Sequence, residues 1–141
     1  MNIDQMTIED FIEIMAQNAE IYPEFDALPD EQKRLIANGN IVTGTAETFR
    51  EDDGTIYGVG GIRHNGIGEC WFINPPEARR HPKKLLRVVR ATFDRIREEK
   101  QLWRVFAESK ISETFLKHCS FKPEPGTYVW TIDGRPNGNE R

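Results

Sequence analysis

The chain has 141 residues, a formal net charge of −4 and 38% hydrophobic residues. This length suits one domain, and the hydrophobic content excludes an intrinsically disordered chain. The negative charge gives no general attraction to nucleic acid, and no apolar run is long enough to cross a membrane. We therefore expect a cytoplasmic protein with a single domain over residues 1–133 and a polar tail over residues 134–141, and neither a membrane nor a sequence-specific nucleic acid as partner.

The N-terminal third predicts two helices after a short opening strand. A capping box of Thr7 and Asp10 predicts the start of a helix over residues 7–19, where apolar residues recur at helical spacing. After a loop with two prolines, residues 30–38 predict a second helix. We expect it to stop at Gly39, because glycine is common just after the last helical residue.

The middle of the chain alternates polar and apolar residues, which is the period of a strand. Residues 41–49 and 55–62 predict two strands joined by a hairpin turn at Asp53-Gly54. A second turn signal, Asn65-Gly66, leads into a third strand over residues 69–73. Three antiparallel strands in a row are therefore expected here.

Three glycines lie inside the second of these strands, at Gly58, Gly60 and Gly61. Glycine weakens a strand unless a bulge or a close backbone approach requires it. They do not form a phosphate-binding loop, because no helix follows them. We expect them to relieve crowding beneath a helix or to leave a groove open.

The last half predicts a long helix over residues 82–100, then a strand at 102–107, a helix at 112–119 and a strand at 127–132. With residues 1–5 as the first strand, this order predicts an α/β (α+β) fold with a mixed, mostly antiparallel sheet and helices on both faces. The first turns of the long helix are crowded with cations. These cations are Lys83, Lys84, Arg87 and Arg90.

The segment before and into the long helix reads Pro76-Glu77-Ala78-Arg79-Arg80-His81-Pro82-Lys83-Lys84. This segment and the order of the predicted elements together resemble the GNAT superfamily of N-acetyltransferases. In that family an Arg/Gln-x-x-Gly-x-Gly/Ala loop and the next helix N-terminus cradle the pyrophosphate of acetyl-CoA. Arg79 keeps the first position of this signature, whereas Pro82 and Lys84 replace its two small residues.

The resemblance implies an acetyl-CoA site in which basic side chains replace the bare backbone of the loop. The alternative for these cations is a solvated helix face. Glu69 on the preceding strand is implied as the general base for an amine substrate, and Glu47 is a comparable candidate. For both, the alternative is an outward-facing carboxylate. The implied cofactor-binding residues are Ile73, Asn74, Arg79, Arg80, His81, Lys83, Lys84 and Ser109.

The last third also resembles the family, with substitutions at its motifs. Phe121 keeps the phenylalanine of a Gly-Phe turn, with Ser120 in place of the glycine. Leu116 stands where many members have a tyrosine that protonates the departing CoA thiolate, and leucine cannot donate a proton. Ser109 stands where many members have an asparagine that contacts the pantetheine arm.

A narrower resemblance covers roughly residues 55–125 and rests on Cys70-Trp71-Phe72, Leu102-Trp103 and Phe115-Leu116-Lys117. These motifs are similar to those of small GNAT-like proteins of short-tailed phages, which include an internal virion protein. Two functions are therefore expected. One is an acetyl-CoA-dependent N-acyltransferase that acts on an amine. The alternative is a catalytically inactive GNAT-fold phage protein, a virion component or a binding protein for a host target, located in the host cytoplasm or the virion.

The other reactive or aromatic side chains are predicted to be structural. Cys70 and Cys119 are expected to be reduced and buried. The three tryptophans lie in predicted strands, where large aromatic residues belong to the core or to half-buried sheet faces. No set of His, Cys, Asp and Glu has the spacing of a metal site.

Overall fold

The computed structural model divides into two compact units. The first comprises residues 1–64 and 71–81, and the second comprises residues 65–70 and 82–141. The predicted tail over residues 134–141 lies outside the described residues, and a single domain over residues 1–133 stays a prediction. The described residues are 1–65, 67–100, 104–106, 113–114, 116–117, 121–125 and 129–132.

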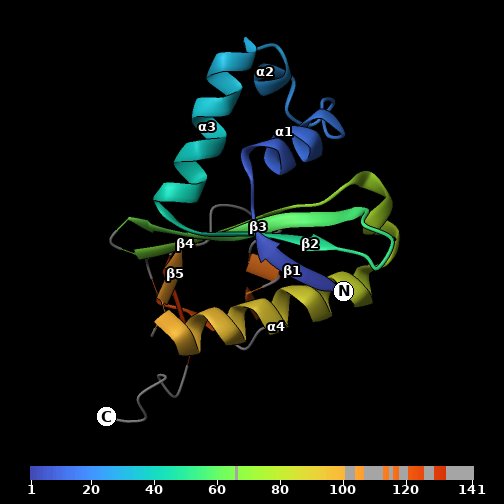
Figure 1. Cartoon of the computed structure of the whole chain (residues 1–141). Helices are drawn as coiled ribbons and strands as arrows, with labels where there is room; N and C mark the ends of the chain where they lie inside the picture. The colour runs from blue at the N-terminus through green and yellow to red at the C-terminus, as the bar shows by residue number, and fades with distance from the viewer. Residues whose placement is uncertain are drawn as a thin grey trace. The chain divides into compact units, whose positions relative to one another are not determined.

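The first unit places helices on one face of an antiparallel sheet. Strand β2 pairs with β1 on one side and with β3 on the other, both antiparallel. The helices α1, α2 and α3 all lie on the same side of these strands (Figure 1). The elements are β1 (Asn2–Gln5), α1 (Ile8–Ala16), α2 (Pro23–Asp26), α3 (Asp30–Val42), β2 (Gly44–Arg50), β3 (Ile56–Asn65), the last residues of β4 (Ile67–Ile73) and the 3-10 helix η1 (Pro76–Arg80).

The second unit contains the long helix and a mixed group of strands. Residues 68 and 69 of β4 pair in parallel with β5, whereas β7 pairs antiparallel with both β5 and β6. Together with the first unit, this confirms the prediction of a mixed, mostly antiparallel α/β fold. The elements are α4 (Pro82–Lys100), β5 (Arg104–Phe106), β6 (Phe121–Pro123) and β7 (Val129–Ile132).

The core of the first unit forms between the helices and the sheet. The α1 side chain Phe11 is 3% exposed, and its ring meets the rings of Phe25 and Trp71 edge-on, with centroids 5.7 and 6.0 Å apart. Burial of this apolar stripe stabilises α1 more than its intrinsic propensity does. The buried cluster comprises Met6, Phe11, Ile14, Met15, Ala37, Ala46, Ile56 and Val59.

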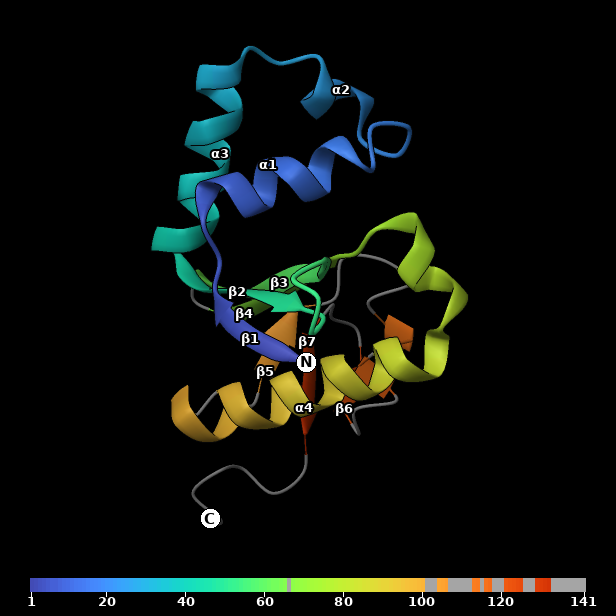
Figure 2. The same cartoon turned by 45° about the vertical axis from the view of Figure 1, so that its right-hand side comes forward.

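The start of α1 is as predicted, but α3 is longer than predicted. Thr7 and Asp10 form the reciprocal capping box, with hydrogen bonds of 3.2 and 3.1 Å. Helix α3 continues through Gly39 to Val42, and it reaches the sheet with its C-terminal end (Figure 2). The glycine costs about 1 kcal/mol in a helix, and the buried residues Ala37 and Asn40 around it anchor the last turns.

The glycine cluster of β3 allows close packing within the sheet itself. A Cβ on Gly60 would lie 2.5 Å from the ring of Phe72, and one on Gly58 would lie 2.7 Å from the same ring. Phe72 also contacts Phe49 of β2, with ring centroids 5.6 Å apart. On Gly61 a Cβ would meet the carbonyl oxygen of Thr45. Crowding is therefore the reason for the glycines, and strands rather than a helix cause it.

Several element bounds differ from the sequence prediction. Helix α1 ends at Ala16 rather than near residue 19, and the predicted proline loop contains the short helix α2. Strand β6 was not predicted, because its three residues include a proline. The Asp53-Gly54 turn is confirmed, with Gly54 at φ +90°, where glycine is favoured. The long helix has the predicted bounds, residues 82–100.

Candidate functional site

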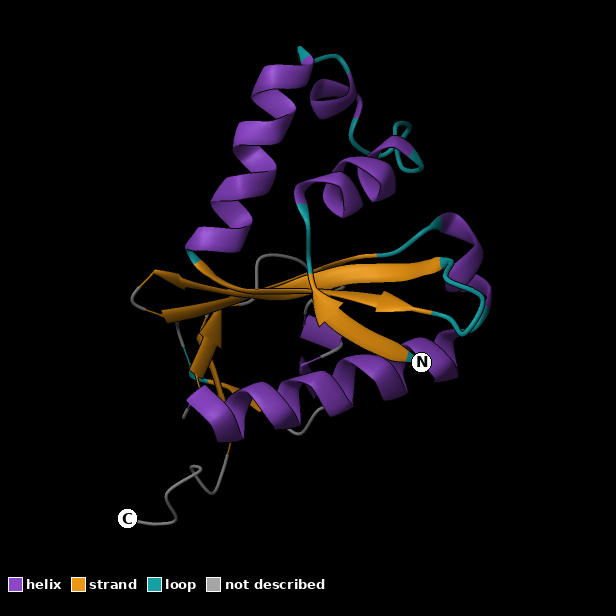
Figure 3. Cartoon of the chain, viewed as in Figure 1, coloured by secondary structure: helices purple, strands orange, loops and turns teal. Residues whose placement is uncertain are grey.

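The candidate cofactor segment begins in the first unit, where a short loop joins the end of β4 to η1 (Figure 3). Ala78 is 4% exposed and anchors η1, whereas Glu77 and Arg80 form an exposed ion pair with 3.4 Å between nitrogen and oxygen. Arg79 also belongs to η1, and His81 follows it as an exposed residue. The segment that resembles the family's loop therefore contains a turn of 3-10 helix.

Backbone donors in this segment are used within the turn. The amide of Ala78 donates to the carbonyl of Pro75 at 3.0 Å, and the amide of His81 donates to the carbonyl of Ala78 at 3.0 Å. Pro82 has no amide hydrogen. A phosphate group approaching residues 78–82 would therefore meet side chains more readily than backbone N–H groups.

The first turns of α4, in the second unit, carry exposed cations. Lys83, Arg87 and Arg90 are exposed and Lys84 is half-buried, while the first turn contains no acidic residue. The opposite stripe holds Leu85 (7% exposed), Val89 (3%) and Thr92 (5%). A helix N-terminus with this charge pattern favours an anion, because the helix dipole and the side chains have the same sign.

The two predicted base candidates lie on strands. Glu69 of β4 stands opposite Phe106 of β5 and is half-buried. Glu47 of β2 stands between Gln5 and Gly60 and is also half-buried. Half-burial fits both a general base and an outward-facing strand carboxylate, so the role of each glutamate as a base stays a prediction.

A hydrogen bond from Asn18, just after α1, and packing against the core hold the residues at the end of β4 in place. Ile73 packs against the core cluster of the first unit, and Asn74 is 8% exposed. The side-chain amide of Asn18 donates to the carbonyl oxygens of Asn74, at 3.1 Å, and of Ile14, at 2.9 Å. Asn18 is 2% exposed. This connection fixes where the chain leaves β4.

The sequence did not predict the role of Asn18, which connects α1 to the end of β4. Asn18 follows the last turn of α1, and no local pattern links it with a partner 56 residues away. The one available signal is an asparagine just after an apolar helical stripe, a position typical of a side chain that bonds backbone groups.

The second unit buries Leu116, for which the sequence resemblance implied the tyrosine position. Leu116 is 1% exposed and lies in a helical stretch, with Lys117 exposed beside it. Trp130 is 8% exposed and Trp71 is half-buried, so both lie in the core or on a half-buried sheet face, as predicted. Ser109, Trp103 and Cys119 lie outside the described residues.

No cluster of three or more His, Cys, Asp or Glu side chains suited to a metal ion is found among the residues that the structure describes. Within the same residues, none of the helices has the length and apolar character needed to cross a membrane.

The fold is similar to that of several solved acetyltransferases. A spermidine N-acetyltransferase SpeG chimera from Vibrio cholerae and hSSAT aligns over 92% of both chains, with 14% identity and a TM-score of 0.68. An acetyltransferase (GNAT family) from Bacillus anthracis aligns over 91% of this chain and 88% of its own, with 14% identity and a TM-score of 0.63.

A third similar structure is a predicted acetyltransferase with acetyl-CoA from Clostridium acetobutylicum. It aligns over 89% of this chain and 92% of its own, with 10% identity and a TM-score of 0.58. No protein-family model matches the chain, and no curated protein matches its sequence. The chain has the fold of GNAT acetyltransferases, as the sequence predicted.

Proposed function

We propose that this chain is an acyl-CoA-dependent N-acyltransferase. The observation that carries the proposal is the likeness over 92% of both chains to a spermidine N-acetyltransferase. Acetyl-CoA is the proposed acyl donor, because a second similar structure was determined with it. An amine is the proposed acceptor, and the cytoplasm is the proposed location.

The basic segment fits an anionic cofactor through side chains. Arg80, Lys83 and Arg87 are exposed, and the neighbouring amides of Ala78 and His81 already donate within the turn. Guanidinium and ammonium groups bind phosphate by charge-assisted hydrogen bonds without requiring a bare backbone. The proposed pyrophosphate ligands are Arg79, Arg80, His81, Lys83 and Lys84. Those proposed for the pantetheine arm are Ile73, Asn74 and Ser109.

The proposed chemistry needs little from the protein beyond positioning and one base. Acyl-CoA, when bound, supplies an activated thioester. Glu69 accepts the proton of the amine, so that the nitrogen lone pair is available for attack. Leu116 has no proton to give to the departing thiolate, so solvent relays to the thiolate the second proton that the nitrogen loses when the amide forms. Orientation of the two substrates then contributes most of the rate.

The test is release of free thiol from acetyl-CoA with a panel of amines that includes spermidine. Glu69→Gln is expected to lower kcat about 100-fold with an unchanged KM for acetyl-CoA. Glu47→Gln is the comparison variant, because Glu47 is the other half-buried strand glutamate and the other base candidate. Equal activity of the two variants would reject Glu69 as the base. Absence of thiol release with every amine would reject catalysis.

We also propose a second candidate, a catalytically inactive protein of the same fold. Two observations favour it: Leu116 is buried at the family's tyrosine position, and the amides of Ala78 and His81 are engaged. By the resemblance of the sequence to small proteins of short-tailed phages, its role is that of a virion component or of a binding protein for a host target. A fold can persist after its activity is lost.

A further inference from the structure

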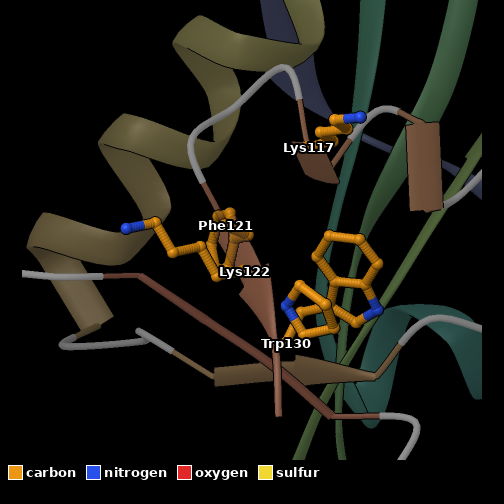
Figure 4. A pocket seen from close by; sticks show the side chains of 5 residues that line it. Lys117, Phe121, Lys122 and Trp130 are labelled. Atoms are coloured by element: carbon orange, nitrogen blue, oxygen red, sulfur yellow. The ribbon is translucent and has the colours of Figure 1, made fainter. Parts of the chain in front are cut away.

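The C-terminal part of the second unit contains a hollow of about 500 Å³ that the proposed function does not use. It is lined by Lys117, Phe121, Lys122, Pro123 and Trp130 (Figure 4). Its volume lies in the range of small-molecule sites in proteins. All of these lining residues, which are the described ones, belong to the second unit.

The floor of the hollow is apolar and firmly held. Phe121 is 4% exposed and Trp130 is 8% exposed, so their rings are fixed by packing. Pro123 of β6 stands directly opposite Trp130 of β7 in the antiparallel ladder. Cross-strand neighbours of this kind are within contact distance, so the exposed pyrrolidine and the part of the indole that stays exposed form an apolar patch. Such a surface suits an aromatic ring.

The rim of the hollow is positively charged. Lys117 and Lys122 are both exposed, and no carboxylate is among the described residues that line the hollow. In Figure 4 the indole of Trp130 points toward Lys117, whereas the ammonium group of Lys122 extends away from the indole. Lys117 is therefore the cation best placed for a group bound over Trp130.

We infer that this hollow binds a small aromatic carboxylate. The ring lies on Phe121, Pro123 and Trp130, and the carboxylate accepts a charge-assisted hydrogen bond from Lys117. A neutral ring of the same size keeps the apolar contacts but loses this bond. An aromatic amine of the same size is repelled by the two lysines. The inference does not depend on acyl-CoA binding, since none of these residues belongs to the segment proposed for that cofactor.

The first experiment compares three probes that share a benzyl group and carry a negative, a neutral or a positive polar group. Phenylacetate, benzyl alcohol and benzylamine are titrated into ¹⁵N-labelled protein, and the indole N–H signal of Trp130, identified with Trp130→Phe, is followed. Phenylacetate is expected to shift this signal and to bind roughly tenfold more tightly than benzyl alcohol, with benzylamine weakest. Equal affinities, or no shift with phenylacetate at tens of millimolar, would overturn the inference.

The second experiment tests the cation. Lys117→Gln is expected to weaken phenylacetate roughly tenfold and to leave benzyl alcohol unchanged, since only the carboxylate uses the ammonium group. Because Lys117 is exposed, the variant keeps the fold. Lys33→Gln, which changes a lysine of α3, is the matched control and leaves both affinities unchanged. Unaltered phenylacetate binding in Lys117→Gln would contradict the assignment.

Discussion

Asp10 and Thr48 join helix α1 to strand β2, with the Thr48 hydroxyl donating to the Asp10 carboxylate at 2.8 Å. The same carboxylate forms an ion pair with Arg50 and caps α1 through Thr7. Burial acts to raise the pKa of Asp10, but the hydrogen bonds from Thr48 and Thr7 and the charge of Arg50 outweigh it and lower the pKa. The carboxylate of Asp10 therefore links helix α1 to strand β2.

Asp10→Asn is expected to lower the free energy of unfolding by about 2 kcal/mol at neutral pH, because Arg50 loses its partner in a largely buried site. The folded pKa of Asp10 is below the unfolded value, so its stabilisation is present above the unfolded pKa and is lost as the pH falls through the folded pKa. The difference in unfolding free energy between wild type and variant should therefore begin to narrow near the unfolded pKa, about pH 4, and continue to narrow as the pH falls toward the lower folded pKa.

Urea unfolding over a range of pH measures this gap. Glu9→Gln is the control, because Glu9 is an exposed neighbour that pairs with Arg34 at the surface, and such pairs contribute little. A gap that stays constant down to the acid limit would mean that the charge of Asp10 does not stabilise the fold.

The glycines of β3 and α3 should respond to alanine in opposite directions. Gly60→Ala is expected to destabilise the protein by about 2 kcal/mol, since the new methyl group meets the Phe72 ring at 2.5 Å and the Trp71 carbonyl oxygen at 2.8 Å. Gly39→Ala should stabilise it by about 0.5–1 kcal/mol, because the site is helical and an added Cβ would have no atom within 4 Å apart from its chain neighbours and its own helix backbone. Thermal unfolding of both variants tests the pair; equal signs would refute the packing argument.

A double variant separates side-chain crowding from backbone crowding. The nearest neighbour of a Cβ on Gly58 is the Phe72 ring, whereas that of a Cβ on Gly61 is the Thr45 carbonyl oxygen. We expect Phe72→Leu to relieve part of the cost of Gly58→Ala and none of the cost of Gly61→Ala. Additive free energies in both double variants would show that Phe72 does not select glycine at position 58.

Asn18→Asp should be more damaging than Asn18→Ala. The side-chain amide of Asn18 donates to two carbonyl oxygens, and a carboxylate in its place would face both of them without a hydrogen to donate. We expect a loss of about 1–2 kcal/mol for alanine and a larger loss for aspartate. Chemical unfolding measures both. A smaller loss for aspartate would contradict the donor role of Asn18.

The sequence predicted the parts of the fold that follow from local chemistry. The capping box of Thr7 and Asp10, the Asp53-Gly54 turn and the amphipathic helix over residues 82–100 are each determined by neighbouring residues. The end of α3 could not be predicted in this way. Glycine at position 39 is a stop signal locally, and the packing of Ala37 and Asn40 outweighs it.

The candidate site was predicted only in its sequence-local part. The basic run was visible because its charges are consecutive, and so was the loss of the two small loop residues. The use of the Ala78 and His81 amides within η1, the anchoring of Asn74 by Asn18, and the hollow over Trp130 depend on chain segments that are distant in sequence or on turn geometry. Hydrophobic and charge patterns do not encode such contacts.

Calorimetric titration with acetyl-CoA and with CoA tests the central claim most directly. The decisive variant changes Arg80 and Lys83 to glutamine together, and the matched control changes Lys33 and Arg34, an adjacent basic pair of α3. We predict that wild type and control bind acetyl-CoA at micromolar concentration, that the Arg80/Lys83 variant binds at least about tenfold more weakly, and that added salt weakens binding. No binding at millimolar acetyl-CoA, or equal binding by the two variants, would contradict the proposed cofactor site.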